Sequence, residues 1–279
     1  MQLIRRASFL SSSQIVSFNK NGFLYLPNMI PLTDIAVVKR RAYEHIESWR
    51  PDNHPIFTTK EQARISDEYF FKSAYNISFF FEESVKPPIK DKHASINKIG
   101  HALHDLDPEF RNFSYRNEFK SILTDIGFVN PQIVQSMYIV KAPRVGGEVK
   151  AHQDSSYIIS EPSSCIGIWI ALEDAEMHNA CLYAVPGSHK NGTLALWERK
   201  EGGMAYTNQF EYHTKDAVCL EAKAGTVIIL HGDLVHWSEQ NYSEKSRHAY
   251  TLHCVEGNYK WSDKNWIQRP DYFPFRIWE

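Results

Sequence analysis

The spacing of hydrophobic positions along this chain changes near residue 131. Before that point, apolar residues recur at intervals of three and four, as on one face of a helix. After Pro131 they alternate with a period of two, as in a strand. We therefore predict a helical N-terminal part over about residues 12–130 and a β-rich core over about residues 131–260, in a single domain spanning residues 1–279.

Three stretches of the N-terminal part have the spacing of helices. The first begins at a cap on Ser12 or Ser13 and ends at Asn21-Gly22, and residues 23–26 then have the character of a strand. The second begins at a cap on Thr33 or Asp34 and runs to about residue 49. The third covers about residues 108–126.

Short strands dominate the C-terminal half. They are predicted at residues 132–140, 146–150, 165–172, 181–185, 217–221, 226–230 and 247–255. Turn signals such as Pro186-Gly187 and Ala224-Gly225 separate them. The pattern indicates a mainly β fold with flanking helices, built on a jelly-roll or barrel core.

Composition excludes several classes of protein. With 43% hydrophobic and 23% charged residues, a formal net charge of -2 and a pI near 6.7, the chain resembles an ordinary globular protein. It has no basic excess for nucleic-acid binding, and no apolar run approaches the 18 residues of a membrane span. Four cysteines without CxxC spacing are expected to be reduced and buried: Cys165, Cys181, Cys219 and Cys254.

The N-terminus bears on the cellular location. We expect an intracellular, cytoplasmic protein. Arg5, Arg6 and Lys20 precede the first acidic residue, Asp34, so a mitochondrial leader is the alternative to a short basic tail.

The tripeptide His152-Gln153-Asp154 lies between two predicted strands. Residues i and i+2 of a strand point to the same face, so an imidazole and a carboxylate are presented together. They would supply two ligands of a 2-His-1-carboxylate facial triad, which leaves three positions open on a ferrous ion. The third ligand must come from a distant strand, and the candidates are His231, His236, His248 and His253.

His236 is the preferred third ligand because it follows the apolar strand that ends at Leu230. Arg247 then begins the next strand. A guanidinium at that place can grip the distal carboxylate of a bound dicarboxylic acid with two hydrogen bonds.

These motifs resemble the phytanoyl-CoA dioxygenase family of iron(II)- and 2-oxoglutarate-dependent oxygenases. The core of the resemblance is His152-x-Asp154, His236-x-Ser238 and Arg247. Further similar stretches are Ser95–His104, Val134–Ile139, Gly146–Val149, Pro186–His189, Asn241 with Ser243, and Trp261-Ser262. The similarity covers about residues 13–266, and residues 198–213 lie outside what can be matched.

The resemblance implies a dioxygenase that couples oxidative decarboxylation of 2-oxoglutarate to hydroxylation of a small organic substrate, such as an acyl-CoA or another lipid-like molecule. The core would be a double-stranded β-helix, the jelly roll of cupin-like proteins. Fe(II) would be the metal, and 2-oxoglutarate and O₂ the cosubstrates. It implies His152, Asp154 and His236 as catalytic metal ligands. The 2-oxoglutarate site would be lined by Lys98, Met137, Trp169, Ser238 and Arg247, with Arg247 holding the C5 carboxylate. Without the resemblance, Lys98 would be interpreted as a surface lysine, and Met137 and Trp169 as core residues.

Two alternatives stay open at this point. One is a jelly roll that binds a metabolite or partner without turnover, and the other is a cupin-like zinc or manganese enzyme in which Arg247 would have no role. Two local hypotheses concern other residues. The aromatic segment 69–81, Phe79 included, could form a wall of the substrate pocket, and His101 and His104 on one helix could form a second metal site, although hydrogen-bonded histidines are the simpler interpretation.

Overall fold

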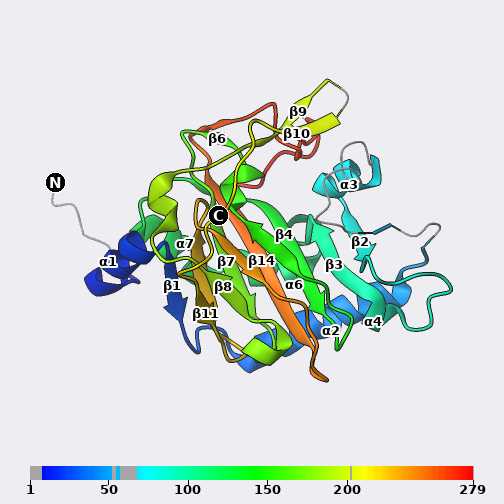
Figure 1. Ribbon diagram of the computed structural model, residues 1–279. Helices are drawn as coiled ribbons and strands as arrows, with labels where there is room; N and C mark the ends of the chain where they lie inside the picture. The colour runs from blue at the N-terminus through cyan, green and yellow to red at the C-terminus, as the bar shows by residue number, and fades with distance from the viewer. Residues whose placement is uncertain (1–7, 52–54, 57–67, 202, 279) are drawn as a thin grey trace.

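Two antiparallel sheets form the centre of the protein (Figure 1). The computed structural model describes residues 8–51, 55–56, 68–201 and 203–278. The larger sheet has the strand order β1 (Phe23–Leu26), β12 (Val227–His231), β7 (Ile166–Ala171), β14 (Arg247–Glu256), β4 (Pro131–Lys141), β3 (Ile96–His101) and β2 (Ile77–Phe81). The smaller sheet has the order β11 (Val218–Leu220), β8 (Leu182–Ala184), β13 (His236–Ser238) and β5 (Val149–His152).

Two further strand pairs lie outside these sheets. They are β9 (Trp197–Lys200) with β10 (Gly203–Tyr206), and β6 (Ser160–Glu161) with β15 (Lys260–Trp261). Figure 1 shows the β9–β10 hairpin at one end of the molecule. The two facing sheets confirm the predicted cupin-like jelly roll.

Side-chain alternation divides the larger sheet into two faces. On β7, Ile168 and Ile170 pack in the cluster that contains the helices, while Trp169 and Ala171 pack with Leu182 of the smaller sheet. A strand that is buried on both faces requires apolar residues at every position, and all six residues of β7 are buried. Inward positions of the larger sheet therefore face the smaller sheet and the space between the two.

Most of the helices cover the outer face of the larger sheet, and α2 (Leu32–Ser48) runs across its back (Figure 1). The exception is α3 (Glu68–Lys72), whose Phe70 packs with Trp197 and Trp266. The helices are α1 (Ser12–Asn21), α2 (Leu32–Ser48), α3 (Glu68–Lys72), α4 (Lys92–Ser95), α5 (Leu103–Leu106), α6 (Pro108–Ser114) and α7 (Asn117–Asp125), with short 3₁₀ turns η2 (Ser73–Tyr75), η3 (Asp154–Ser156), η4 (Met177–Asn179) and η5 (Ser188–Asn191). The predicted stripe Ile35, Val38, Ala42 and Ile46 of α2 is buried against the sheet.

Three predicted helix boundaries were wrong. The cap of α1 is Ser11, which accepts a hydrogen bond from the Gln14 amide, and not Ser12 or Ser13. Helix α2 begins at Leu32 after Pro31 and uses no side-chain cap, so neither Thr33 nor Asp34 caps it. The stretch 108–126 is two helices, because Tyr115 and Arg116 leave helical geometry.

The N-terminal part is less helical than its spacing predicted. Three of its segments, β1, β2 and β3, join the larger sheet, and only β1 was foreseen. Strand β5 begins at Val149 rather than at residue 146, and the three-residue strand β13 was not predicted. The extent of the domain stays a prediction.

Three of the cysteines are buried and all four are free, but Cys219 on the edge strand β11 is exposed, which corrects the expectation for that residue. Among the described residues, no helix combines the length and the apolar character that a bilayer crossing requires. Arg5 and Arg6 lie outside the described residues.

Candidate active site

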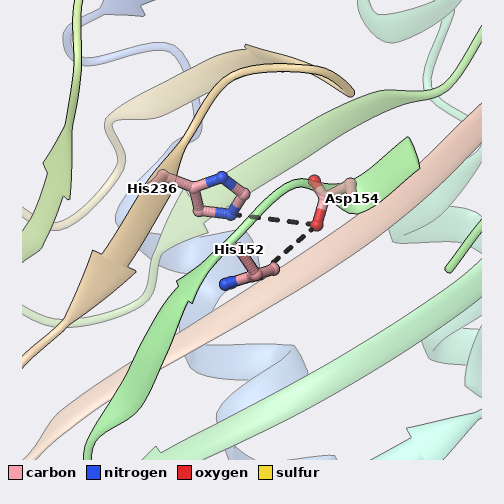
Figure 2. A group of neighbouring side chains, drawn as sticks. All are labelled: His152, Asp154 and His236. Atoms are coloured by element: carbon pink, nitrogen blue, oxygen red, sulfur yellow. Dashed lines mark ion pairs between the residues drawn. The ribbon is translucent and has the colours of Figure 1, made fainter. Parts of the chain in front are cut away.

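Strands β5 and β13 of the smaller sheet bring the three predicted ligands together. His152 ends β5 and His236 begins β13, and the two are directly paired across the strands. Asp154 opens the 3₁₀ turn that follows β5. Figure 2 shows both imidazoles directed at the Asp154 carboxylate, with Nε2–Oδ1 distances of 3.5 Å for His152 and 3.8 Å for His236. One ligand atom from each residue lies within 4.8 Å of the other two.

Backbone carbonyls fix the orientation of both imidazoles. The Nδ1 atom of His152 lies 2.8 Å from the Lys150 carbonyl oxygen, and that of His236 lies 3.0 Å from the Leu234 carbonyl oxygen. A ring that donates through Nδ1 carries its lone pair on Nε2, the atom turned toward Asp154. This tautomer is the one that ligates a metal.

The protonation states also suit metal binding. Burial lowers the pKa of His236 to about 4, and the neighbouring His152 adds to the shift. Burial on its own would raise the pKa of Asp154, but His253 and His236 hold it well below its usual value. A neutral imidazole and an ionised carboxylate are the forms in which these groups bind a metal ion. The donor set therefore fits a divalent transition metal.

Two residues of the larger sheet complete the surroundings of Asp154. The Nε2 atom of His253 on β14 lies 3.2 Å from Asp154 Oδ1. Gly167 on β7 lies opposite the carboxylate, and a Cβ atom at this position would come within 2.9 Å of Asp154 Oδ2. His253 had been a candidate third ligand. The structure places it against the ligand carboxylate instead, outside the group of three.

A cavity of about 680 Å³ opens from this group between the sheets. This volume is in the usual range for a small-molecule site. One end contains Arg247, and the other is aromatic, with Phe70, Tyr157, Trp197, Tyr206, Phe210, Tyr212 and Trp266. The two ends of the cavity lie at opposite ends of β14. Arg247 pairs with Lys141 at one end of β4, whereas Val255, which packs in one cluster with Phe70 and Trp197, pairs with Gln132 at the other.

Arg247 is almost fully buried, with 1% of its surface exposed. Its Nε atom donates to the Ala180 carbonyl at 2.9 Å, and the guanidinium lies over the Trp169 ring, 5.7 Å from the centroid. Burial lowers the pKa of Arg247 to about 10, so the side chain is still charged at neutral pH. No described acidic residue forms an ion pair with it. A buried charge of this kind requires a counter-charge, which a bound anion would supply.

The remaining residues implied by the family resemblance also line the cavity. Lys98 is 5% exposed, and its Nζ atom lies 3.5 Å from the Met137 sulfur. Trp169 and Ser238 line the same space, Ser238 two residues beyond His236 on β13. The structure therefore gathers all five predicted cosubstrate residues in one cavity with the three metal ligands. Their roles stay predictions.

Lys141 was missed by the sequence reasoning. It is 1% exposed, and its Nζ atom donates to the carbonyl oxygens of Gly147 and Glu239, the latter at 2.7 Å. Burial holds the pKa of Lys141 well below its usual value, and Arg247 adds to the shift. A signal existed in the sequence, because Lys141 continues the inward positions Met137 and Ile139 along β4.

The aromatic wall was only partly foreseen. Phe70 of the segment 69–81 lines the cavity. Phe79 instead lies on the helix side of the sheet, where its ring stacks on that of Trp49 with 4.8 Å between the ring centroids. The hypothesis for Phe79 was therefore wrong. Much of the wall comes instead from the unmatched segment around β9 and β10, which carries Trp197, Tyr206, Phe210 and Tyr212.

The other histidines singled out in the sequence have structural partners. His101 ends β3 and bonds Ser73 through Nδ1, whereas His104 lies in α5 and bonds Ser136 and Asp105. The two therefore share neither a helix nor a metal site. His248 bonds the Tyr138 hydroxyl, and the His231 ring packs beside that of His189. Neither remaining third-ligand candidate joins the group of three.

Comparisons with known proteins agree with this geometry. The family described as Phytanoyl-CoA dioxygenase (PhyH) matches residues 18–249. The chain is 44% identical to a phytanoyl-CoA dioxygenase of Arabidopsis thaliana over 269 residues, which cover 93% of this chain and 94% of that protein. It is 38% identical to phytanoyl-CoA dioxygenase domain-containing protein 1 of Bos taurus over 287 residues, which cover 95% of this chain and 97% of that protein.

Two solved structures share the fold at low identity. EctD from S. alaskensis in its apoform has a TM-score of 0.67 and 17% identity, covering 99% of this chain and 88% of that one. The non-heme alpha ketoglutarate dependent carbocyclase SnoK has a TM-score of 0.64 and 17% identity, covering 95% of this chain and 96% of that one.

The family match spans most of the chain, and the described residues place its metal-ligand pattern in one site. This combination confirms the prediction of Fe(II) as the metal and of 2-oxoglutarate and O₂ as cosubstrates. The chain belongs to the phytanoyl-CoA dioxygenase family.

Proposed function

We propose that this protein is an Fe(II)- and 2-oxoglutarate-dependent dioxygenase that couples oxidative decarboxylation of 2-oxoglutarate, giving succinate and CO₂, to hydroxylation of a small organic substrate. One observation carries the proposal. The buried Arg247, without an acidic partner among the described residues, lies in the same cavity as His152, Asp154 and His236. A metal site and an anion site that share one cavity fit a chelating dicarboxylate cosubstrate.

His152, Asp154 and His236 would hold the iron. When bound there, Fe(II) supplies open coordination positions for 2-oxoglutarate and O₂ and the oxidising chemistry itself. The chain's own contribution is to turn Nε2 of both histidines toward the metal position through the carbonyls of Lys150 and Leu234. Burial keeps His236 neutral, and the neighbouring histidines keep Asp154 ionised.

Arg247 would bind the C5 carboxylate of 2-oxoglutarate. Because the Ala180 carbonyl takes the Nε hydrogen bond, the terminal N–H groups are left for a ligand, and the stacked Trp169 ring limits movement of the guanidinium. Lys98, Met137 and Ser238 would line the rest of this end of the cavity.

The aromatic end would hold the prime substrate and keep water from the reacting carbon. An acyl-CoA, which the family name suggests, stays a prediction. Helix α2 carries a run of three basic residues, Lys39-Arg40-Arg41. This run does not support an acyl-CoA substrate, because Lys39 pairs with Glu173 and Arg41 with Asp107 on the helix side of the sheet. Lys150 is the exposed basic residue at the cavity itself.

Arg247 also bears on the two alternatives. A non-redox zinc or manganese enzyme would use the buried guanidinium only for an anionic substrate, and its activity would not depend on O₂. A binding protein without turnover would keep Arg247 but would release no succinate.

Succinate formation tests the proposal. Purified protein with Fe(II), 2-oxoglutarate and O₂ is expected to form succinate, slowly in the absence of a prime substrate. Arg247→Met is expected to form at least ~10-fold less at a subsaturating 2-oxoglutarate concentration, because a buried charge-assisted pair is worth roughly 2–5 kcal/mol. Arg40→Met, on the exposed surface of α2, is the matched control. Succinate formation that does not depend on O₂, or equal rates in both variants, would contradict the proposal.

A further inference from the structure

Gln153, between two of the metal ligands, is a polar residue to which the chemistry above assigns no role. It is fully buried, and its backbone is extended, with φ -118° and ψ 132°. Its side chain therefore leaves the chain on the side opposite His152 and Asp154. A buried amide must find its hydrogen-bond partners within the protein.

The partners of Gln153 come from two other parts of the chain. Its Nε2 atom donates to the carbonyl oxygens of Gly192 at 2.9 Å and Asp233 at 2.6 Å. Its Oε1 atom accepts the Leu194 amide at 2.8 Å. Both N–H groups and the carbonyl oxygen are thus engaged, and every partner is a backbone group.

The first of these parts is the turn that leads into His236. The Asp233 carbonyl lies three residues before this ligand, and the Gly232 carbonyl accepts the amide of Ser155, the residue after Asp154. Thr193 also donates to the Asp233 carboxylate, at 2.6 Å. Gln153 therefore joins the segment carrying two ligands to the segment carrying the third.

The second part is the start of the segment 192–212, which contains β9 and β10. This segment supplies Trp197, Tyr206, Phe210 and Tyr212 to the aromatic end of the cavity. On the side away from the metal site, Arg199 on β9 holds this segment, because its side chain donates to the carbonyl oxygens of Asn265 and Trp266. On the metal side, the Tyr157 and Tyr206 hydroxyls meet at 2.5 Å, and Gln153 fixes the segment where it begins.

We propose that Gln153 is a positioning residue that joins the metal-binding turn to the segment 192–212 and so fixes the substrate side of the cavity relative to the metal site. Its significance for the reaction rests on the proposed function. The three side-chain hydrogen bonds of Gln153, called the tether below, are a property of the folded chain. These hydrogen bonds matter for the reaction because they fix the wall that holds the substrate, and small displacements of a bound substrate from the reacting centre reduce the rate strongly.

Gln153→Glu tests the tether with little change of shape. The variant keeps an acceptor for the Leu194 amide but loses both donors and places a carboxylate against two carbonyl oxygens. Amide hydrogen exchange of the metal-free protein is the readout. We expect exchange in residues 192–212 to rise roughly 10-fold relative to wild type, with the central strands β7 and β12 unchanged.

Gln209→Glu is the matched control, because Gln209 is an exposed glutamine of the same segment. Its exchange is expected to equal that of wild type. A Gln153→Glu protein that exchanges like the control, or one that loosens uniformly across the sheets, would overturn the proposal. Should the glutamate variant fail to fold, wild type itself decides, since an unprotected Leu194 amide would show that the tether is absent.

A separate arm connects the tether to turnover. In Gln153→Glu, the Fe(II) concentration for half-maximal succinate formation is expected to rise roughly 10- to 100-fold, the usual effect of removing an outer partner of a metal site. The half-maximal concentration of 2-oxoglutarate is expected to stay within about threefold, because Arg247 lies at the other end of the cavity. Absence of succinate even from wild type would refute the proposed function, whereas the exchange result would still decide the tether.

Discussion

At the scale of single residues, backbone carbonyl groups orient the polar side chains of the site. The two histidine ligands are oriented by carbonyl oxygens, and so are the buried basic side chains of Arg247 and Lys141. Backbone carbonyls orient a cation without neutralising it. Arg247 therefore keeps its full charge for a ligand, in a place where water does not screen it.

Arg247→Lys separates charge from geometry. Lysine keeps the positive charge but loses the planar fork and the Nε bond to Ala180, so we expect 2-oxoglutarate to bind roughly 30-fold more weakly, a loss of about 2 kcal/mol. Anaerobic calorimetry of the Fe(II)-loaded protein measures this constant. Arg40→Lys on the surface of α2 serves as the control, and equal affinity in the two variants would show that Arg247 acts only as a point charge or does not contact the cosubstrate.

At the scale of elements, the start of α1 depends on one side chain. Ser11 accepts from the Gln14 amide at 3.3 Å, and the Gln14 side chain accepts from the Ser11 amide at 2.8 Å, which together form a capping box. The sequence signal was present, because a glutamine three residues after a serine marks Ser11 rather than Ser12 or Ser13.

Ser11→Ala is expected to reduce the free energy of unfolding by about 1 kcal/mol, because the Gln14 amide at the helix start loses the Ser11 hydroxyl as its acceptor. For a chain of this size, the melting temperature should fall by roughly 2–4 °C. Ser12→Ala is the control and should change little. Equal melting temperatures for both variants would mean that the capping box contributes nothing.

Most long elements could be predicted from the sequence, and the short ones could not. The runs that became β4, β7 and β14 have enough apolar residues to show their period, and the ligand pattern on β5 needs only the alternation of a strand. Strand β3 contains Lys98 and His101, which its tertiary environment buries, and β13 has three residues. Neither length nor composition identifies such strands. Strand β2 was not predicted either, so Phe79 could not be assigned to a face.

At the scale of the whole molecule, the buried histidines connect stability to pH. His248 lies on the helix side of the larger sheet, and its Nδ1 atom bonds the Tyr138 hydroxyl at 2.8 Å. Burial lowers its pKa to about 4, against the partial opposition of Glu173. The unfolded chain takes up this proton near pH 6.5 and the folded protein only near pH 4. The contribution of His248 is therefore complete above about pH 6.5 and is lost as the pH falls toward 4.

Replacing His248 should reduce this acid sensitivity. From pH 7 to pH 5, the free energy of unfolding of the wild type should fall by about 2 kcal/mol more than that of His248→Gln, as measured by urea unfolding at the two pH values. His178→Gln, at an exposed position, should behave like the wild type. A fall of the same size in His248→Gln would show that other groups cause the acid sensitivity.

The most direct test of the central claim is an anaerobic titration of the metal-free protein with Fe(II) and then 2-oxoglutarate, followed by visible absorption. The weak band of ferrous iron chelated by 2-oxoglutarate is expected in the wild type and in Asp216→Ala, an exposed control. No band is expected in Asp154→Ala, which lacks one of the three metal ligands. A folded, iron-loaded wild-type protein without the band, or an equal band in Asp154→Ala, would contradict the assignment of this cavity as a 2-oxoglutarate-dependent iron site.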